Sequence, residues 1–238
     1  MIPEVNAPHP YLSRTRSFTR RGDRMPPRHQ VAYDDLAPRY VIDVPRDGGE
    51  TTVDPAFTLD VADVFGRTAP LVVEVGPGSG DALLAGAAAR PDWDFLALEV
   101  WRPGIGQALM HLREQQPPNI AFVEADAAVA LQTMLPEASV AEVWTFFPDP
   151  WPKRKHLRRR IVQPEFAGTV CRVLAPGGLW RLATDIGAYA THMRAVLDAD
   201  ERFALLSTER APLRPVTRFE RKGVAVGRAI ADLAYQRR

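Results

Sequence analysis

The chain has 238 residues, of which 46% are hydrophobic and 25% are charged, and its formal net charge is +1. This length and balance predict one large globular α/β domain, and they exclude an extensively disordered or membrane-embedded chain. A single cysteine, Cys171, excludes an intrachain disulfide and a cysteine-built zinc site, and its apolar neighbours indicate a packed thiol. The residues after Met1 are polar and proline-rich, without the apolar core of a secretory signal, so we expect a cytoplasmic protein.

Residues 1 to about 50 are rich in proline and arginine and show neither helical nor strand periodicity. We therefore predict a mobile basic arm over 1–50, with at most one short ordered piece, and a folded domain over 51–238. Local potential, rather than net charge, recruits a polyanion. Two segments concentrate the cations, one in the arm (Arg14, Arg16, Arg20, Arg21, Arg24 and Arg28) and one later (Lys153, Arg154, Lys155, Arg158, Arg159 and Arg160).

The domain is predicted to open with a short helix that has Asp54 as its N-cap, Pro55 at its first position and Gly66 at its end. Apolar runs of strand length then alternate with helical patterns, and the expected strands are 71–76, 94–100, 119–126, 141–148, 178–185, 203–209 and 225–236. This alternation predicts right-handed βαβ units and a mostly parallel, seven-stranded sheet buried on both faces. The last two strands lack a long helix between them, which predicts an antiparallel strand at the sheet edge.

A glycine-rich turn, Glu74-Val-Gly76-Pro-Gly78-Ser-Gly80, joins the first strand to a helix that opens at Asp81. Its glycines permit tight turning and a close approach of the backbone to a ligand. An acid at the helix N-terminus disfavours the pyrophosphate of NAD, whereas a cofactor with an α-amino group and a sulfonium tolerates it. The turn therefore favours S-adenosylmethionine, and a purely structural glycine turn is the alternative.

The predicted strands end in acids or acid-containing turns, at Glu74, Glu99, Asp126, Asp149 and Asp185. In a parallel sheet the ligand site forms outside the carboxyl ends of the strands, so these acids are expected at one edge. Carboxylates that lie close together repel one another, so this arrangement predicts a ligand whose cationic and hydroxyl groups offset the repulsion. Glu99 is placed to accept hydrogen bonds from ribose hydroxyls and Asp126 from an adenine amino group. For either acid alone, helix capping is the alternative.

The most informative stretch is Phe146-Phe-Pro-Asp-Pro-Trp-Pro-Lys-Arg-Lys-His-Leu-Arg-Arg-Arg160. It resembles the signature of the bacterial tRNA (guanine-N7)-methyltransferase family, which modifies the variable-loop guanine numbered 46. Three further segments are similar to motifs of that family: Arg16-Ser-Phe-Thr-Arg-Arg21, Glu99-Val-Trp-Arg-Pro-Gly104 and Thr217-Arg-Phe-Glu220. The resemblance covers nearly the whole chain from about residue 14. Trp101 and Arg228 depart from it, since the family often has histidine at each position.

The resemblance implies a Rossmann-like class I fold and transfer of a methyl group from S-adenosylmethionine to N7 of guanine 46 in tRNA. It implies that Asp149 lies at the catalytic centre and also contacts the cofactor, together with Glu74, Gly76, Gly78, Gly80, Glu99 and Asp126. It assigns the substrate to Lys153, Asp185, Thr217, Arg218, Phe219 and Glu220. It assigns contacts with the RNA to Lys155, His156, Arg158, Arg159 and Arg160.

The chemistry of guanine agrees with these assignments. N7 carries an in-plane lone pair and no proton at neutral pH, so attack on a sulfonium methyl needs alignment more than a general base. Asp149 is therefore interpreted as an orienting and electrostatic group, and we expect no metal. Three alternatives remain: methylation of another RNA base or of a small molecule, an RNA-binding module without catalysis, and a solvated helix start for the basic run. Monomer and homodimer are both open.

Overall fold

The computed structural model describes residues 16–19, 22 and 24–238, apart from the side chains of Arg218 and Phe219. Three arginines of the predicted arm, Arg14, Arg20 and Arg21, lie outside the described residues. Across the described ranges, no helix is long and apolar enough to cross a membrane.

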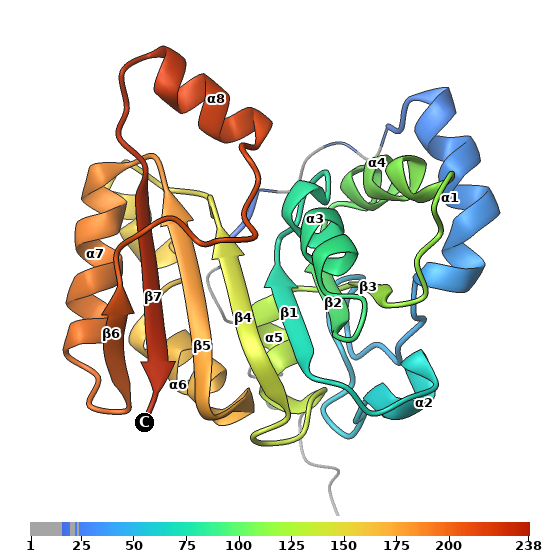
Figure 1. Cartoon of the computed structure of the whole chain (residues 1–238), viewed down its shortest axis with the longest axis horizontal. Helices are drawn as coiled ribbons and strands as arrows, with labels where there is room; N and C mark the ends of the chain where they lie inside the picture. The colour runs from blue at the N-terminus through green and yellow to red at the C-terminus, as the bar shows by residue number, and fades with distance from the viewer. Residues whose placement is uncertain (1–15, 20–21, 23) are drawn as a thin grey trace, which may run out of the picture.

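Within the described residues, seven strands form one sheet in the order β3-β2-β1-β4-β5-β7-β6. They are β1 (Leu71–Val75), β2 (Asp94–Glu99), β3 (Ile120–Glu124), β4 (Val140–Phe146), β5 (Leu174–Thr184), β6 (Phe203–Ser207) and β7 (Ala231–Arg237). Strands β1 to β5 pair in parallel, whereas β7 pairs antiparallel with both β5 and β6. The mostly parallel α/β sheet predicted from the sequence is confirmed, and its antiparallel strand lies between β5 and the edge strand β6 (Figure 1).

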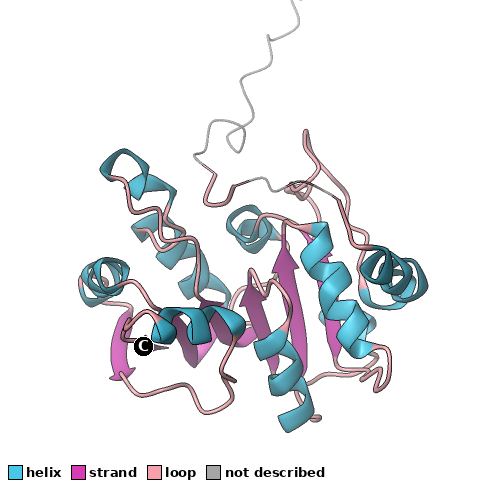
Figure 2. Ribbon diagram, turned by 90° about the horizontal axis from the view of Figure 1, so that it is seen from above, coloured by secondary structure: helices cyan, strands magenta, loops and turns pink. Residues whose placement is uncertain are grey.

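Helices cover both faces of the sheet, as Figure 2 shows from above. One face carries α1 (Pro27–Tyr40), α3 (Asp81–Ala89) and α4 (Arg102–Leu112), and the other carries α5 (Ala127–Thr133), α6 (Pro164–Val173) and α7 (Gly187–Asp198). Neighbouring residues of a strand point to opposite faces, so Val72 packs in one apolar cluster and Val73 in the other. Cys171 is buried in the second cluster, as its apolar neighbours predict.

Residues 27–44 pack with the rest of the domain, although the sequence predicted a mobile arm over 1–50. Helix α1 packs along α4, and it buries His29, Ala32, Leu36 and Tyr40. Beyond the helix, the amide of Ile42 donates to Phe122 of β3 over 2.8 Å. The buried positions of α1 recur every three or four residues, which is a helical period, but polar residues and three prolines around them hide this narrow stripe.

The helix predicted with Asp54 as its N-cap begins six residues later than predicted. Asp54 accepts a hydrogen bond from the amide of Ala56 in a local turn, and Asp60 is the N-cap of α2 (Val61–Phe65). Aspartate is a favoured N-cap residue, so residue type alone could not show which of the two, Asp54 or Asp60, caps the helix. Gly66 ends the helix in the left-handed conformation, with φ of 66°, as predicted.

Candidate functional site

A cavity of about 440 Å³ opens at the edge where the parallel strands end. Residues that follow β1, β2, β3 and β4 line it, and the arm and α8 (Arg218–Ala225) contribute as well. Its principal lining residues are Ser17, Phe18, Thr19, Gly76, Gly78, Glu99, Val100, Trp101, Asp126, Phe147, Pro148, Asp149 and Lys222. Helix α8 lies above the sheet on this side (Figure 1). The ligand site therefore forms at the edge expected for an open parallel sheet.

The three glycines of the first turn have different tasks. Gly76 and Gly78 line the cavity with φ of 68° and 57°, a backbone region that other residues rarely adopt. Gly80 is buried beside the cavity, where a Cβ would lie 2.9 Å from the Cβ of Ala108 on α4. Gly80 thus allows α3 to pack closely on α4, while Gly76 and Gly78 bring the backbone to the cavity wall.

Glu99 holds the walls of the cavity together through backbone amides. Its Oε2 accepts from the amide of Gly78, and its Oε1 accepts from the amides of Val100 and Trp101, each over 2.9 Å. Charge-assisted bonds of this kind are roughly twice as strong as neutral ones. The carboxylate therefore fixes the glycine turn against the start of α4 while lining the cavity itself.

Glu74 lies buried beneath the glycine turn rather than in the cavity wall. Burial raises the pKa of Glu74 to about 8, and the nearby Glu99 and Asp81 carboxylates add to this rise, while the amide of Leu83 opposes it. Among the described residues, Oε2 of Glu74 has no hydrogen-bond partner. A buried carboxyl with one such oxygen favours the neutral form until a cationic group lies beside it.

Asp126 and Asp149 both line the cavity but differ in their local structure. Asp126 is the N-cap of α5, and its Oδ1 accepts from the amide of Ala128 over 3.0 Å, so helix capping and a place in the cavity coexist. Asp149 lies in the turn after β4, between Phe147 with φ of 52° and Trp151 with φ of 42°. Positive φ values at bulky residues are strained, and such strain concentrates at functional sites.

The basic run forms η1 (Arg154–Arg159), and the structure divides its members by exposure. Lys153, Arg154, Lys155 and Arg158 are exposed. His156 contacts the ring of Trp151 edge-on, and loss of hydration, Lys155 and Arg159 lower its pKa. These side chains form a cationic surface beside the turn of Asp149.

Arg160 is set apart from this surface. Its side chain is buried, and its guanidinium donates to the carbonyls of Pro150 and Ala188 over 2.9 and 3.2 Å. It also lies 4.7 Å from the ring centroid of Tyr189. Arg160 therefore supports the turn of Asp149 and is not part of the exposed cationic surface, although the family resemblance assigned it a contact with RNA.

Arm residues 17–19 line the cavity, and side chains of the domain bind the described residues around them. The indole of Trp151 donates to the carbonyl of Ser17 over 2.8 Å, and Arg159 donates to the carbonyls of Arg16 and Phe18. The guanidinium of Arg159 lies 3.6 Å from the ring centroid of Trp151.

A second tryptophan holds the arm at a later residue. The indole of Trp101 donates to the carbonyl of Gly22 over 3.2 Å. Trp101 is one of the two departures from the family pattern, and the structure assigns it this contact with the arm.

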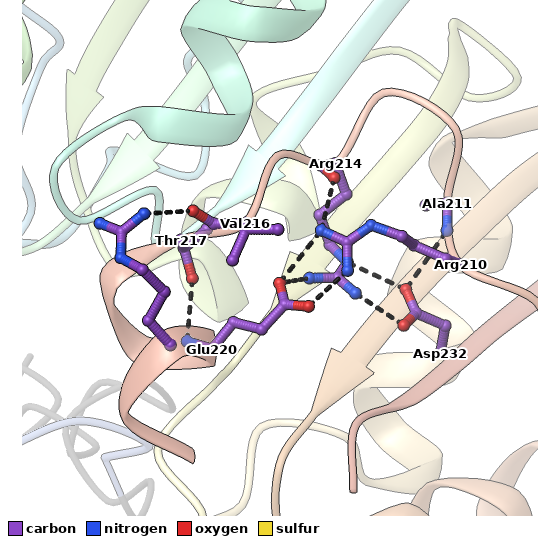
Figure 3. Close-up of polar contacts among 8 residues, drawn as sticks. Arg210, Ala211, Arg214, Val216, Thr217, Glu220 and Asp232 are labelled. Atoms are coloured by element: carbon purple, nitrogen blue, oxygen red, sulfur yellow. Dashed lines mark hydrogen bonds and ion pairs between the residues drawn. The ribbon is translucent and has the colours of Figure 1, made fainter. Parts of the chain in front are cut away.

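The segment Thr217 to Glu220 begins α8. The hydroxyl of Thr217 accepts from the amide of Glu220, and the Glu220 carboxylate accepts from Arg210 and Arg214 (Figure 3). Desolvation alone raises the pKa of Glu220, but these hydrogen bonds outweigh it, so the pKa lies below its ordinary value. The side chains of Arg218 and Phe219, predicted to hold the substrate, lie outside the described residues.

Asp185 contacts the C-terminal end of the α8 region. Its Oδ2 accepts from Arg228 over 2.7 Å, and Gly223 lies so close that a Cβ there would be 3.0 Å from the Asp185 side chain. Arg228, the second departure from the family pattern, thus pairs with an acid predicted to hold the substrate.

Residues 68–233 match the model of a family described as "Putative methyltransferase". Proteins named tRNA (guanine-N(7)-)-methyltransferase are similar over most of their length. The one from Arthrobacter sp. (strain FB24) is 45% identical over 216 residues, which are 90% of this chain and 68% of the relative. The one from Cutibacterium acnes (strain DSM 16379 / KPA171202) is 47% identical over 227 residues, 93% of this chain and 82% of the relative. The chain belongs to the bacterial tRNA (guanine-N(7)-)-methyltransferase family.

Solved structures support the fold of this family member. The 16S rRNA methyltransferase KamB aligns with a TM-score of 0.57 and 15% identity over 76% of this chain and 94% of that one. A 16S rRNA (adenine(1408)-N(1))-methyltransferase from Catenulisporales acidiphilia, solved with its cosubstrate SAM, aligns with a TM-score of 0.52 and 15% identity, over 82% of this chain and 96% of that one. At such low identity the likeness shows the Rossmann-like methyltransferase fold alone.

Sequence reasoning missed three contributors to the cavity of this methyltransferase-family chain. Lys222 follows the Thr-Arg-Phe-Glu segment by two residues, and Phe147 lies inside the most informative stretch, but neither was singled out. The arm residues 17–19 belong to a matched motif, yet the sequence carried no signal that places them over the cavity.

Proposed function

We propose that this chain transfers a methyl group from S-adenosyl-L-methionine to N7 of guanine 46 in the variable loop of tRNA, and that it acts in the cytoplasm. One observation carries the proposal. A single cavity joins Glu99 at the end of β2 and Asp126 after β3 to the turn of Asp149, and an exposed cationic surface adjoins that turn. Relatives that are 45% and 47% identical are named tRNA (guanine-N(7)-)-methyltransferase, which supports the same reaction.

The residues of the site fit the cofactor. Glu74 lies beneath the glycine turn, and its Oε2 is buried without a hydrogen-bond partner among the described residues. An ammonium group bound at that turn would stabilise the ionised form of Glu74 and lower its raised pKa. Glu99 and Asp126 would receive the ribose hydroxyls and the adenine amino group from the adjoining cavity wall. When bound, the cofactor supplies an electrophilic methyl group on a sulfonium.

The residues of the chain align and stabilise rather than remove a proton. The turn of Phe147, Pro148 and Asp149 forms the wall of the cavity nearest the cationic surface. Positive charge develops on the guanine ring during transfer, and the carboxylate of Asp149 would stabilise that charge where it arises. Lys153, Lys155, His156 and Arg158 would hold the RNA backbone, because cations without acids between them bind phosphates.

The test uses labelled S-adenosylmethionine with tRNA that lacks the modification, followed by digestion and identification of the labelled nucleoside. We expect the label in 7-methylguanosine, and its loss from a matched tRNA in which guanine 46 is replaced by adenine. Label in another nucleoside would establish the alternative of another RNA base. Tight binding of tRNA without any label would establish a non-catalytic RNA-binding module.

A further inference from the structure

Arg214 lies at the centre of a group of four charged residues that Figure 3 shows, of which Arg214, Glu220 and Asp232 are buried. Its side chain is 0% exposed. Nε and Nη2 donate to the two oxygens of Asp232 over 2.9 and 2.7 Å, and Nη1 donates to Glu220. Arg210 donates to Glu220 from the outer side and to the carbonyl of Arg214 over 2.9 Å. Two cations thus balance two carboxylates.

A gain in folding stability does not by itself explain why these charged residues are grouped here. Removing charges from water costs several kcal/mol per ion, and well-packed apolar residues of similar volume often stabilise a protein as well or better. A planar guanidinium with fixed donors, however, sets the direction of each partner. The hydrogen bonds of Arg214 therefore fix the relative positions of the elements that they join.

Those elements form two sides of the cofactor cavity. Glu220 lies in the first turn of α8, and Lys222 on the same helix lines the cavity. On the other side, the guanidinium carbon of Arg214 lies 5.2 Å from the ring centroid of Phe147. Phe147 also lines the cavity, one residue before Pro148 and two before Asp149.

The conformation of Phe147 needs support from its surroundings. Its φ of 52° is strained for an aromatic residue, and strained backbone persists only where neighbouring contacts over-determine it. The Phe147 amide donates to the carbonyl of Ala183 on β5 over 2.8 Å, and Arg214 lies near its ring. These two contacts fix both the backbone and the side chain at the start of the catalytic turn.

We propose that Arg214 is a positioning residue, which keeps the turn of Phe147, Pro148 and Asp149 in register with α8 across the cofactor cavity. This inference rests on the proposed function, since the register matters for aligning a guanine with a methyl donor. Lysine at this position keeps the charge but loses the planar two-donor contact with Asp232 and the flat face near the Phe147 ring.

Arg214→Lys is the test, and Arg67→Lys is its matched control. Arg67 also donates two nitrogens to a buried carboxylate, that of Asp94, but at the start of β2, on the edge of the sheet opposite the cavity. We expect Arg214→Lys to slow single-turnover methylation of tRNA by roughly 10- to 100-fold, while cofactor affinity changes less than about threefold. Arg67→Lys lowers the melting temperature without slowing transfer.

Hydrogen exchange of the Phe147 amide gives a readout that does not depend on activity. Arg214→Lys is expected to speed this exchange by about tenfold, and Arg67→Lys to leave it unchanged. Equal methylation rates in the two lysine variants, or unchanged exchange at Phe147, would overturn the proposal. If Arg214→Lys does not fold, Asp232→Asn weakens the hold on Arg214 and is measured in the same way.

The two proposals fail in distinguishable ways. Wild-type protein that places no label in 7-methylguanosine would refute the proposed function. Exchange at Phe147 in the same variants would still decide whether Arg214 positions the turn.

Discussion

Replacing Glu74 by glutamine is expected to remove a loss of stability that the ligand-free protein suffers as pH rises. Burial first, and then the Glu99 and Asp81 carboxylates, raise the pKa of Glu74 from its ordinary 4.5 to about 8. Between these two values the folded protein keeps a proton that the unfolded chain has released, so the free energy of unfolding falls as pH rises. The loss is at most about 1.4 kcal/mol per pH unit, and it ends above the folded pKa.

The assay is urea unfolding of ligand-free wild type and Glu74→Gln at several values between about pH 5 and pH 8. Other groups titrate in this window with the opposite sign. Burial lowers the pKa of His29 and His192, so their contribution to stability grows with pH. The difference between wild type and Glu74→Gln cancels these contributions. We expect that difference to grow in favour of the variant by a few kcal/mol from the acid to the alkaline end.

Glu142→Gln is the control, because the pKa of Glu142 is shifted in the opposite direction to that of Glu74. Desolvation raises the pKa of Glu142, but hydrogen bonds from Arg181 and Trp144 outweigh it, so the pKa lies below its ordinary value. The stability that Glu142 contributes is present above its unfolded pKa and is lost only as pH falls through the folded pKa. Glu142→Gln should therefore be destabilised by nearly the same amount across the window. Parallel stability profiles of wild type and Glu74→Gln would refute the reasoning about Glu74.

Four further outcomes are expected. Glu99→Gln removes a charged acceptor of three backbone amides, so calorimetry should show cofactor binding weakened by about 10- to 100-fold; an unchanged Kd would exclude this role. Asp149→Asn should slow single-turnover transfer by roughly 100-fold with the fold intact, and a wild-type rate would remove Asp149 from the mechanism. Combined Lys155→Ala and Arg158→Ala should flatten the slope of log tRNA affinity against log salt by about 1.4, whereas the parental slope would indicate a merely solvated surface. Trp151→Phe loses one hydrogen bond to the arm, and stopped-flow should show cofactor dissociation about fivefold faster; an unchanged rate would show that the arm does not retain the cofactor.

The strands of the sheet were predictable because both of their faces are buried. All residues of β1 and β2 are buried, and such continuous apolar runs between turns of glycine and acid are distinctive in a sequence. The edge strand was predicted close to its place, whereas β7 begins at Ala231, because α8 ends at Ala225 and a turn and loop over 226–230 follow it. The position of the cavity was predictable as well, because the turns after parallel strands all lie at one edge of the sheet.

Helix α1 shows where this reasoning reached its limit. Its buried residues follow a helical period, but a narrow stripe among prolines and charged residues resembles a polar segment until α4 is there to cover it. Leu36 and Tyr40 become buried only when α1 packs against α4. The sequence pattern of α1 alone does not show that α4 will cover it.

The basic run also has properties that the sequence shows and others that depend on folding. The sequence alone shows that this run is cationic and follows the turn of Asp149. In the folded chain Arg158 is exposed, Arg159 binds the arm and Arg160 is buried against the turn, and no sequence pattern separates these three arginines. The physical reason is that a guanidinium takes its role from the carbonyls and rings around it. Those of Arg159 and Arg160 include Phe18 and Ala188, far away in the chain and brought near only by folding.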